Sequence, residues 1–133
     1  MLRIISLNLN GIRSAWRRNV LIWVVAQAPD IVCLQELKAQ LPDLAADMLA
    51  PDGMHAFYHV AQKKGYSGVG VWCRQQPERV LEGFGHDEFD AEGRYIRADF
   101  GKLSVISLYL PSGSSSPERQ EAKFRFLDAF LPH

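Results

Sequence analysis

Two short apolar runs separated by one helical pattern constrain the fold of this chain most strongly. Residues 2–8 and 31–35 have strand length and are rich in β-branched and apolar side chains. Between them, residues 14–27 carry apolar side chains at helical spacing, and a proline ends that pattern. The segment therefore predicts a β-α-β unit, whose two strands run parallel through a right-handed crossover. Both strands then end at the same edge of one sheet, which brings Asn8 and Glu36 to that edge.

The rest of the chain predicts two hairpins, a short strand and a closing helix. The predicted elements are a helix at 42–49, strands at 55–61, 68–74, 79–83, 94–100 and 103–109, and a helix that begins at Pro117. Ser116 is the candidate N-terminal cap of that last helix. Its apolar residues are Phe124, Leu127 and Leu131 on one stripe, with Phe126 and Phe130 beside it. This order predicts a mixed α/β layered domain, and because no strand follows the last helix, the layers look like half of a larger sandwich.

The overall composition indicates a soluble single domain and gives no clear electrostatic sign of a partner. The chain has 15 Lys plus Arg against 15 Asp plus Glu, and 47% of its residues are hydrophobic. Cys33 and Cys73 lie inside apolar runs, so we expect reduced, buried thiols. No signal peptide and no run of about 18 apolar residues is evident. We therefore expect a cytoplasmic protein with no membrane partner.

Polar side chains follow three predicted strands at the point where each ends. They are Asn8 with Asn10, Glu36 with Lys38, and Tyr109. Carboxylate and amide oxygens suit Mg²⁺, which at such a site can neutralise the charge of a phosphate. Lys38 is expected to hold the carboxylate or to meet a phosphate, and Tyr109 to orient a phosphoryl oxygen or a nucleophile. Each residue also has a structural interpretation: turn asparagines, a loop glutamate and a strand-end aromatic ring.

Two glycine-containing motifs add candidate contacts to a sugar-phosphate backbone. The 65–68 turn brackets Tyr66 with glycines, although an ordinary hairpin turn has the same composition. The 92–94 motif either presents Arg94 to a phosphate or pairs it with a nearby acid. No second acid accompanies Glu36 in a convincing position, and the chain has no Asp-His dipeptide. The sequence thus predicts a fragment of a metal site without an evident general base.

Five blocks together resemble the exonuclease III branch of the endonuclease/exonuclease/phosphatase superfamily, which includes the apurinic/apyrimidinic endonucleases. The blocks are Ser6-Leu-Asn-Leu-Asn-Gly-Ile-Arg13, Leu34-Gln-Glu-Leu-Lys38, Lys64-Gly-Tyr-Ser-Gly-Val69, Glu92-Gly-Arg94 and Leu108-Tyr-Leu-Pro-Ser-Gly113. The resemblance implies the amino-terminal half of a four-layer α/β sandwich, with mixed β-sheet flanked by helices, as one partial domain over residues 1–133. It also implies a DNA-repair hydrolase that uses Mg²⁺, or Mn²⁺, and acts on double-stranded DNA at abasic or 3′-blocked sites.

The resemblance also assigns roles to individual residues. Glu36 would be the metal ligand, Asn8 would support the metal site, and Tyr109 would be the active-site tyrosine that touches the scissile phosphate. Asn10 and Lys38 are expected on the substrate side of that site. The residues implied on or beside the DNA-facing surface are Arg13, Tyr66 and Arg94.

The sequence departs from the family at its end, and this leaves more than one function open. The family's Gly-Asp-x-Asn block, with its catalytic aspartate, and its terminal Ser-Asp-His block do not occur. We therefore predict that these residues alone are catalytically incompetent and that an uncovered apolar face permits self-association. The alternative function is a non-catalytic nucleic-acid- or protein-binding regulator, similar to the catabolite repression control proteins. A phosphatase of the same superfamily is a third possibility, which the 65–68 and 92–94 motifs fit less well.

Overall fold

The computed structural model describes residues 1–112 and 116–132, and it confirms the β-α-β unit at the start of the chain. Strand β1 (Ile4–Asn8) pairs in parallel with β2 (Ile31–Gln35), so that Asn8 lies opposite the last residue of β2. The predicted single helix over 14–27 is wrong. Two helices form instead, α1 (Ile12–Arg17) and α2 (Val20–Ala26). The left-handed backbone of Asn19, with φ of 63°, separates them because it cannot continue a right-handed helix.

The strands form two sheets, and both predicted hairpins are present. Beyond the first unit, the chain forms η1 (Leu41–Asp43), α3 (Ala46–Leu49), η2 (Pro51–Gly53), β3 (His55–His59), β4 (Val69–Cys73), β5 (Arg79–Glu82), α4 (Asp87–Asp90), β6 (Tyr95–Phe100), β7 (Leu103–Leu108) and α5 (Pro117–Phe130). The four-stranded sheet has the order β1-β2-β4-β3, and the three-stranded sheet has the order β5-β6-β7. Every pairing is antiparallel except that of β1 with β2. The predicted helix at 42–49 is replaced by η1, α3 and η2.

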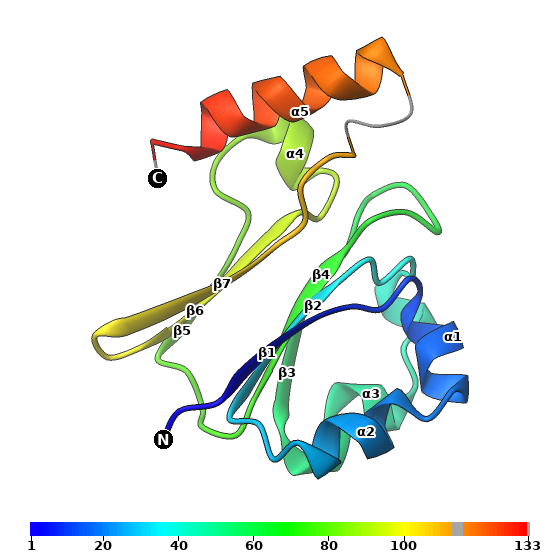
Figure 1. Ribbon diagram of the computed structural model, residues 1–133, viewed down its shortest axis with the longest axis vertical. Helices are drawn as coiled ribbons and strands as arrows, with labels where there is room; N and C mark the ends of the chain where they lie inside the picture. The colour runs from blue at the N-terminus through cyan, green and yellow to red at the C-terminus, as the bar shows by residue number, and fades with distance from the viewer. Residues whose placement is uncertain (113–115, 133) are drawn as a thin grey trace.

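The two sheets face each other, with helices on their outer sides (Figure 1). Aliphatic residues of β2 and β4 pack against β6 and β7 and form the core between the sheets, which also holds both cysteines as free, buried thiols. Helices α1, α2 and α3 cover the other face of the four-stranded sheet through a second core around Trp72. Helix, sheet, sheet and helix thus follow one another, as the predicted layered sandwich requires. No helix in the described ranges is long and apolar enough to span a membrane.

The closing helix begins as predicted but packs through a different side. The backbone N–H of Arg119 donates to Ser116 Oγ at 3.2 Å, which confirms the cap. The predicted stripe is wrong, because Phe124 is 55% exposed whereas Phe126 is fully buried. Phe126 packs against Phe89 of α4. The sequence did not predict α4, because residues 87–90 are mostly acidic.

In the described part of the chain four strands have an unpaired edge: β1 and β3 in one sheet, and β5 and β7 in the other. Strand β1 pairs only with β2, and β7 pairs only with β6. Because β7 packs over β2, the open edges of β1 and β7 lie on the same side of the sandwich. Both strands carry an exposed aliphatic residue, Ile4 on β1 and Ile106 on β7. An exposed strand edge with aliphatic side chains is a surface on which further strands can pair.

Candidate functional site

The loops that follow β1 and β2 hold three residues in a strained backbone conformation. Asn10, Glu36 and Lys38 have φ of 47°, 56° and 50°, in the left-handed region that residues other than glycine seldom adopt. Backbone hydrogen bonds lock the loops together, since the N–H of Gly11 donates to the carbonyl of Glu36 at 2.8 Å. Such strain persists only where the surrounding structure enforces it, and it clusters at functional sites.

Glu36 and Tyr109 meet directly, although 73 positions separate them in the sequence. The Tyr109 hydroxyl donates to Glu36 Oε1 at 2.8 Å. The ring comes from the end of β7, where the N–H of Tyr109 donates to the carbonyl of Arg94 at 2.9 Å. Just before it, the Ser107 hydroxyl donates across to the Leu34 carbonyl of the facing sheet at 2.8 Å. The face-to-face packing of the two sheets is therefore what brings the predicted carboxylate and phenol into contact.

Burial, followed by the hydrogen bond to the Glu36 carboxylate and the charge of that carboxylate, raises the pKa of Tyr109 to about 12. The phenol is therefore neutral near pH 7 and acts as a hydrogen-bond donor. It cannot serve as a base at that pH. A neutral donor beside a carboxylate can hold that carboxylate in one orientation, or it can turn its O–H toward a phosphoryl oxygen.

The two asparagines and Lys38 form a chain of hydrogen bonds beside this pair. The N–H of Asn10 donates to Asn8 Oδ1 at 2.9 Å, so the predicted turn interpretation of these residues is also correct. Lys38 Nζ donates to Asn10 Oδ1 at 2.6 Å. The exposed guanidinium of Arg13 donates to the Lys38 carbonyl at 3.1 Å. Arg13, Arg17 and Lys38 line a cavity of about 250 Å³ with a positively charged wall.

The 65–68 turn is attached to the same loops. Two N–H groups of the loop after β2 donate to the turn: Leu37 to the Gly68 carbonyl at 3.1 Å, and Lys38 to the Ser67 carbonyl at 2.9 Å. Gly68 has φ of +89°, and a Cβ there would lie 3.1 Å from Leu37 Cβ. The predicted hairpin turn is therefore present, and it supports the loop that carries Glu36.

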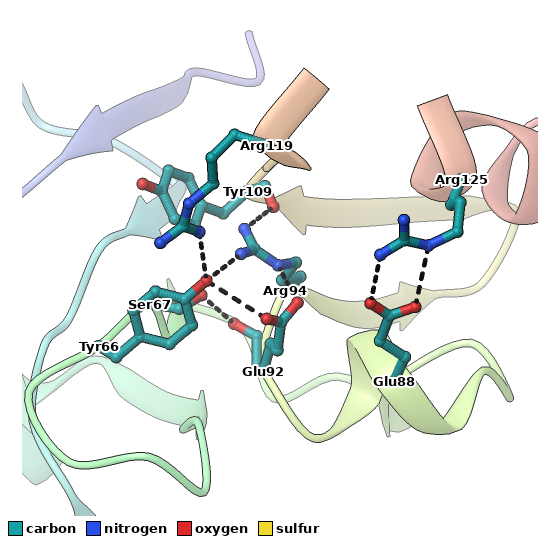
Figure 2. Close-up of polar contacts among 9 residues, drawn as sticks. Tyr66, Ser67, Glu88, Glu92, Arg94, Tyr109, Arg119 and Arg125 are labelled. Carbon is teal, nitrogen blue, oxygen red and sulfur yellow. Dashed lines mark hydrogen bonds and ion pairs between the residues drawn. The ribbon is translucent and has the colours of Figure 1, made fainter. Parts of the chain in front are cut away.

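Figure 2 shows Arg94 at the centre of a polar cluster next to Tyr109. Its guanidinium pairs with Glu92 at 2.9 Å, which is the acid-pairing interpretation of the 92–94 motif. Arg94 also donates to the Tyr66 hydroxyl at 2.7 Å and to the Tyr109 carbonyl at 3.2 Å. The side chain is only 2% exposed. Arg94 therefore lies under the surface rather than on it.

Sequence reasoning missed one member of this cluster, Arg119 of α5. Its guanidinium donates to the Tyr66 hydroxyl at 3.3 Å, and the side chain is exposed. The signal available in the sequence was its position three residues after the Ser116 cap, in the first turn of a helix that follows the Tyr109 loop. Position alone could not show that this turn lies over Tyr66.

The described residues offer a partial set of oxygen ligands for a divalent metal. No group of three or more His, Cys, Asp or Glu side chains suited to a metal ion occurs within 1–112 and 116–132. The Glu36 carboxylate and the Asn8 amide oxygen lie at the ends of neighbouring strands. Mg²⁺ is commonly held by one or two carboxylates, with waters and substrate phosphates as its other ligands. This donor set fits one side of such a site.

Comparison with known proteins finds a matching family model and several similar relatives. The model of the Endonuclease/Exonuclease/phosphatase family matches residues 5–132. The chain is similar to the "Exodeoxyribonuclease" of Bacillus subtilis (strain 168), with 36% identity over 99% of this chain and 52% of the relative. It is also similar to the "DNA repair nuclease APEX1" of Danio rerio, with 38% identity over 85% of this chain and 37% of the relative.

Solved structures show the likeness of the fold. An AP endonuclease from Archaeoglobus fulgidus superimposes with a TM-score of 0.82 and 32% identity, over 96% of this chain and 49% of the other. A 3′-5′ exonuclease from Neisseria meningitidis superimposes with a TM-score of 0.82 and 28% identity, over 98% of this chain and 50% of the other. The chain thus spans about half the length of these structures and of the Bacillus relative.

Proposed function

Because the chain belongs to the endonuclease/exonuclease/phosphatase family, we propose that it is part of a metal-dependent DNA-repair nuclease. Its substrate would be double-stranded DNA with an abasic site or a blocked 3′ end, and its reaction would be hydrolysis of a phosphodiester bond. The observation that carries the proposal is the 2.8 Å contact between Tyr109 and Glu36, at the place where strands of both sheets end. The named activities of its relatives, exodeoxyribonuclease and DNA repair nuclease, support the same class of reaction.

In this proposal Glu36 and Asn8 would hold Mg²⁺, or Mn²⁺ in its place. The cation would supply neutralising charge to the phosphate when bound. The neutral Tyr109 phenol would orient the Glu36 carboxylate before DNA binds and would donate to a phosphoryl oxygen afterwards. Donation to phosphate requires a protonated phenol, which the raised pKa of Tyr109 provides at neutral pH.

The positively charged surface next to this pair would receive the DNA backbone. Arg13 is exposed and Lys38 is half-buried, and both line the same cavity as Arg17. Arginine and lysine are the usual partners of phosphate groups on DNA. Asn10 would contribute by holding the Lys38 ammonium at 2.6 Å. Tyr66 would lie beside the sugar-phosphate backbone on the neighbouring turn.

We propose further that these residues alone do not cleave DNA. The described site has Glu36 as its carboxylate and holds no evident general base, and the chain spans about half of the relatives that it matches. In a complete sandwich, further strands would pair on open edges such as those of β1 and β7. If nothing covers these edges, two copies of the chain would associate through them, which the oligomeric state at high concentration tests.

A non-catalytic binding protein, similar to the catabolite repression control proteins, is the second candidate. The incomplete metal site among the described residues favours it. The strained backbone at Glu36 and its contact with Tyr109 favour the nuclease, because a protein that only binds has no need to maintain either.

Mg²⁺-dependent cleavage of an abasic-site duplex tests the proposal. The product of the full reading frame is compared with its Glu36→Gln variant and with Glu88→Gln, a control that removes a surface carboxylate paired with Arg125. We expect cleavage by the parent and by Glu88→Gln, at least a 100-fold loss in Glu36→Gln, and none from residues 1–133 alone. A full-length protein that binds the duplex but never cuts it would replace the nuclease with the binding protein.

A further inference from the structure

Arg94 is a buried cation, and its surroundings determine what it can do. Its side chain is 2% exposed, and its ion-pair partner, Glu92, is 29% exposed. Removing a guanidinium from water is unfavourable unless hydrogen bonds replace the lost hydration. A side chain at this depth reaches an incoming phosphate only if the cluster above it opens.

The three donor nitrogens of Arg94 each have a different acceptor. Nε donates to Glu92 Oε1 at 2.9 Å, Nη1 to the Tyr109 carbonyl at 3.2 Å, and Nη2 to the Tyr66 hydroxyl at 2.7 Å. These acceptors belong to three separate segments of the chain, as Figure 2 shows. A planar guanidinium is suited to this role because its donors point in fixed, divergent directions.

The two tyrosine rings also lie against the same guanidinium. Arg94 Cζ is 5.6 Å from the centroid of the Tyr66 ring and 5.2 Å from that of Tyr109. Both distances are within the range of cation–π attraction. Arg94 thus restrains the Tyr109 ring at its face and at its backbone carbonyl, while the hydroxyl of that ring reaches Glu36.

We propose that Arg94 is a positioning residue that keeps the Tyr109 phenol on Glu36, and that the phosphate contact at this corner is made by Arg119. Arg119 is exposed on the first turn of α5 and reaches the same Tyr66 hydroxyl from the solvent side. The two arginines therefore have different roles: the buried Arg94 fixes Tyr66 in place, and the exposed Arg119 contacts the DNA phosphate. The DNA-contact half of this proposal rests on the proposed nuclease function; the positioning half does not.

Tyrosine NMR of the chain tests the positioning half without DNA or metal. Glu36→Gln changes the acceptor of the Tyr109 hydroxyl and should shift the Tyr109 Cζ resonance. In an Arg94→Gln or Arg94→Lys background, Glu36→Gln should shift the Tyr109 Cζ resonance much less, because the phenol is no longer held in hydrogen-bonding distance of residue 36. Lysine should not rescue it, since one ammonium cannot replace three divergent donors. An equal shift with and without Arg94 would overturn the assignment.

The fold of these variants is monitored at Tyr58. Its hydroxyl accepts from Trp72 at 2.8 Å in the other core, so its resonance reports folding independently of Arg94. If Arg94→Gln does not fold, Tyr66→Phe takes its place, because it removes the acceptor of Nη2 and keeps the ring. Tyr66→Phe should then shift Tyr109, and an unchanged Tyr109 resonance would refute the role of the cluster.

The salt dependence of binding to an abasic duplex tests the DNA-contact half in the full-length protein. The slope of log K against log salt is negative, and losing one phosphate contact decreases its magnitude by about 0.9. We expect that decrease for Arg119→Gln, its recovery in Arg119→Lys, and an unchanged slope for Arg94→Gln and for the control Arg125→Gln. A decrease for Arg94→Gln with recovery in Arg94→Lys would instead make Arg94 the phosphate contact. A parent protein that binds no DNA would refute the proposed function and, with it, the role of Arg119, while the NMR result for Arg94 would stand.

Discussion

Gly93 offers a quantitative test of how tightly the arginine cluster is built into the fold. Its φ is +60°, and a Cβ at this position would lie 2.6 Å from the His59 carbonyl oxygen and 2.8 Å from the Ala61 nitrogen. Both are backbone atoms, at the last residue of β3 and just after it, so they cannot move aside as a flexible side chain could. Gly93→Ala therefore introduces two separate penalties, one conformational and one steric.

The matched control separates these penalties. Gly65 has φ of +67°, and a Cβ there would meet nothing within 4 Å. Alanine in the left-handed region is destabilised by about 1 kcal/mol relative to glycine, and both variants share this effect. Forcing extra atoms into a packed site adds roughly 1–3 kcal/mol. We therefore expect Gly65→Ala to lower the free energy of unfolding by about 1 kcal/mol, and Gly93→Ala by about 3 kcal/mol.

Urea unfolding, followed by circular dichroism at 25 °C, measures both values when the slope m is the same for each protein. A difference of about 2 kcal/mol between the two variants is the predicted outcome. If Gly93→Ala and Gly65→Ala destabilise equally, the backbone does not approach Gly93 as closely as the structure shows, and the packing argument for the 92–94 motif fails.

Three further changes have defined outcomes. Ser116→Ala removes the acceptor for the Arg119 N–H and should lower the free energy of unfolding by about 1 kcal/mol; no change in urea midpoint would exclude the cap. Glu36→Gln should lower the pKa of Tyr109, because it removes a charge that opposes ionisation, and a titration of tyrosine absorbance or of Cζ shifts reads this directly. Hydrogen bonds from neighbouring arginine and serine side chains hold the pKa of Asp99 at about 2. Its contribution to stability is therefore complete above about pH 4, where the unfolded carboxyl is also ionised, and is lost as the pH falls toward 2. Asp99→Asn should lack that part of the acid-induced loss of stability, and identical pH profiles would contradict the assignment.

The sequence predicted those parts of the fold that depend on local pattern. Alternation and β-branched residues identified the strands, and the β-α-β rule oriented β1 and β2 correctly. The break between α1 and α2 was missed because Asn19 fits a helical pattern and adopts its left-handed backbone only in the folded chain. The buried side of α5 was also missed, because the position of α4 selects Phe126 rather than Phe124, and no local signal places α4.

The candidate site was predictable where residues follow strands, and less so where side chains meet across layers. The predicted ends of two parallel strands were enough to place Asn8 and Glu36 at one edge of a sheet. The contact of Glu36 with Tyr109 was not predictable in this way, because it depends on how the two sheets face each other. The 92–94 motif left two interpretations of Arg94, and only its burial under Tyr66 distinguishes them. Charge and spacing describe which residues are present, whereas depth below the surface is a property of the whole fold.

Paramagnetic broadening by Mn²⁺ tests most directly whether the strand ends around Glu36 form the metal site. Mn²⁺ is titrated into the isotopically labelled chain, and the resonances that broaden first are mapped onto the structure. We predict that the Glu36 amide and the Tyr109 ring broaden first, and that Glu36→Gln abolishes this effect. Broadening that centres on the acidic helix α4, or that persists unchanged in Glu36→Gln, would contradict the assignment of Glu36 as the metal ligand.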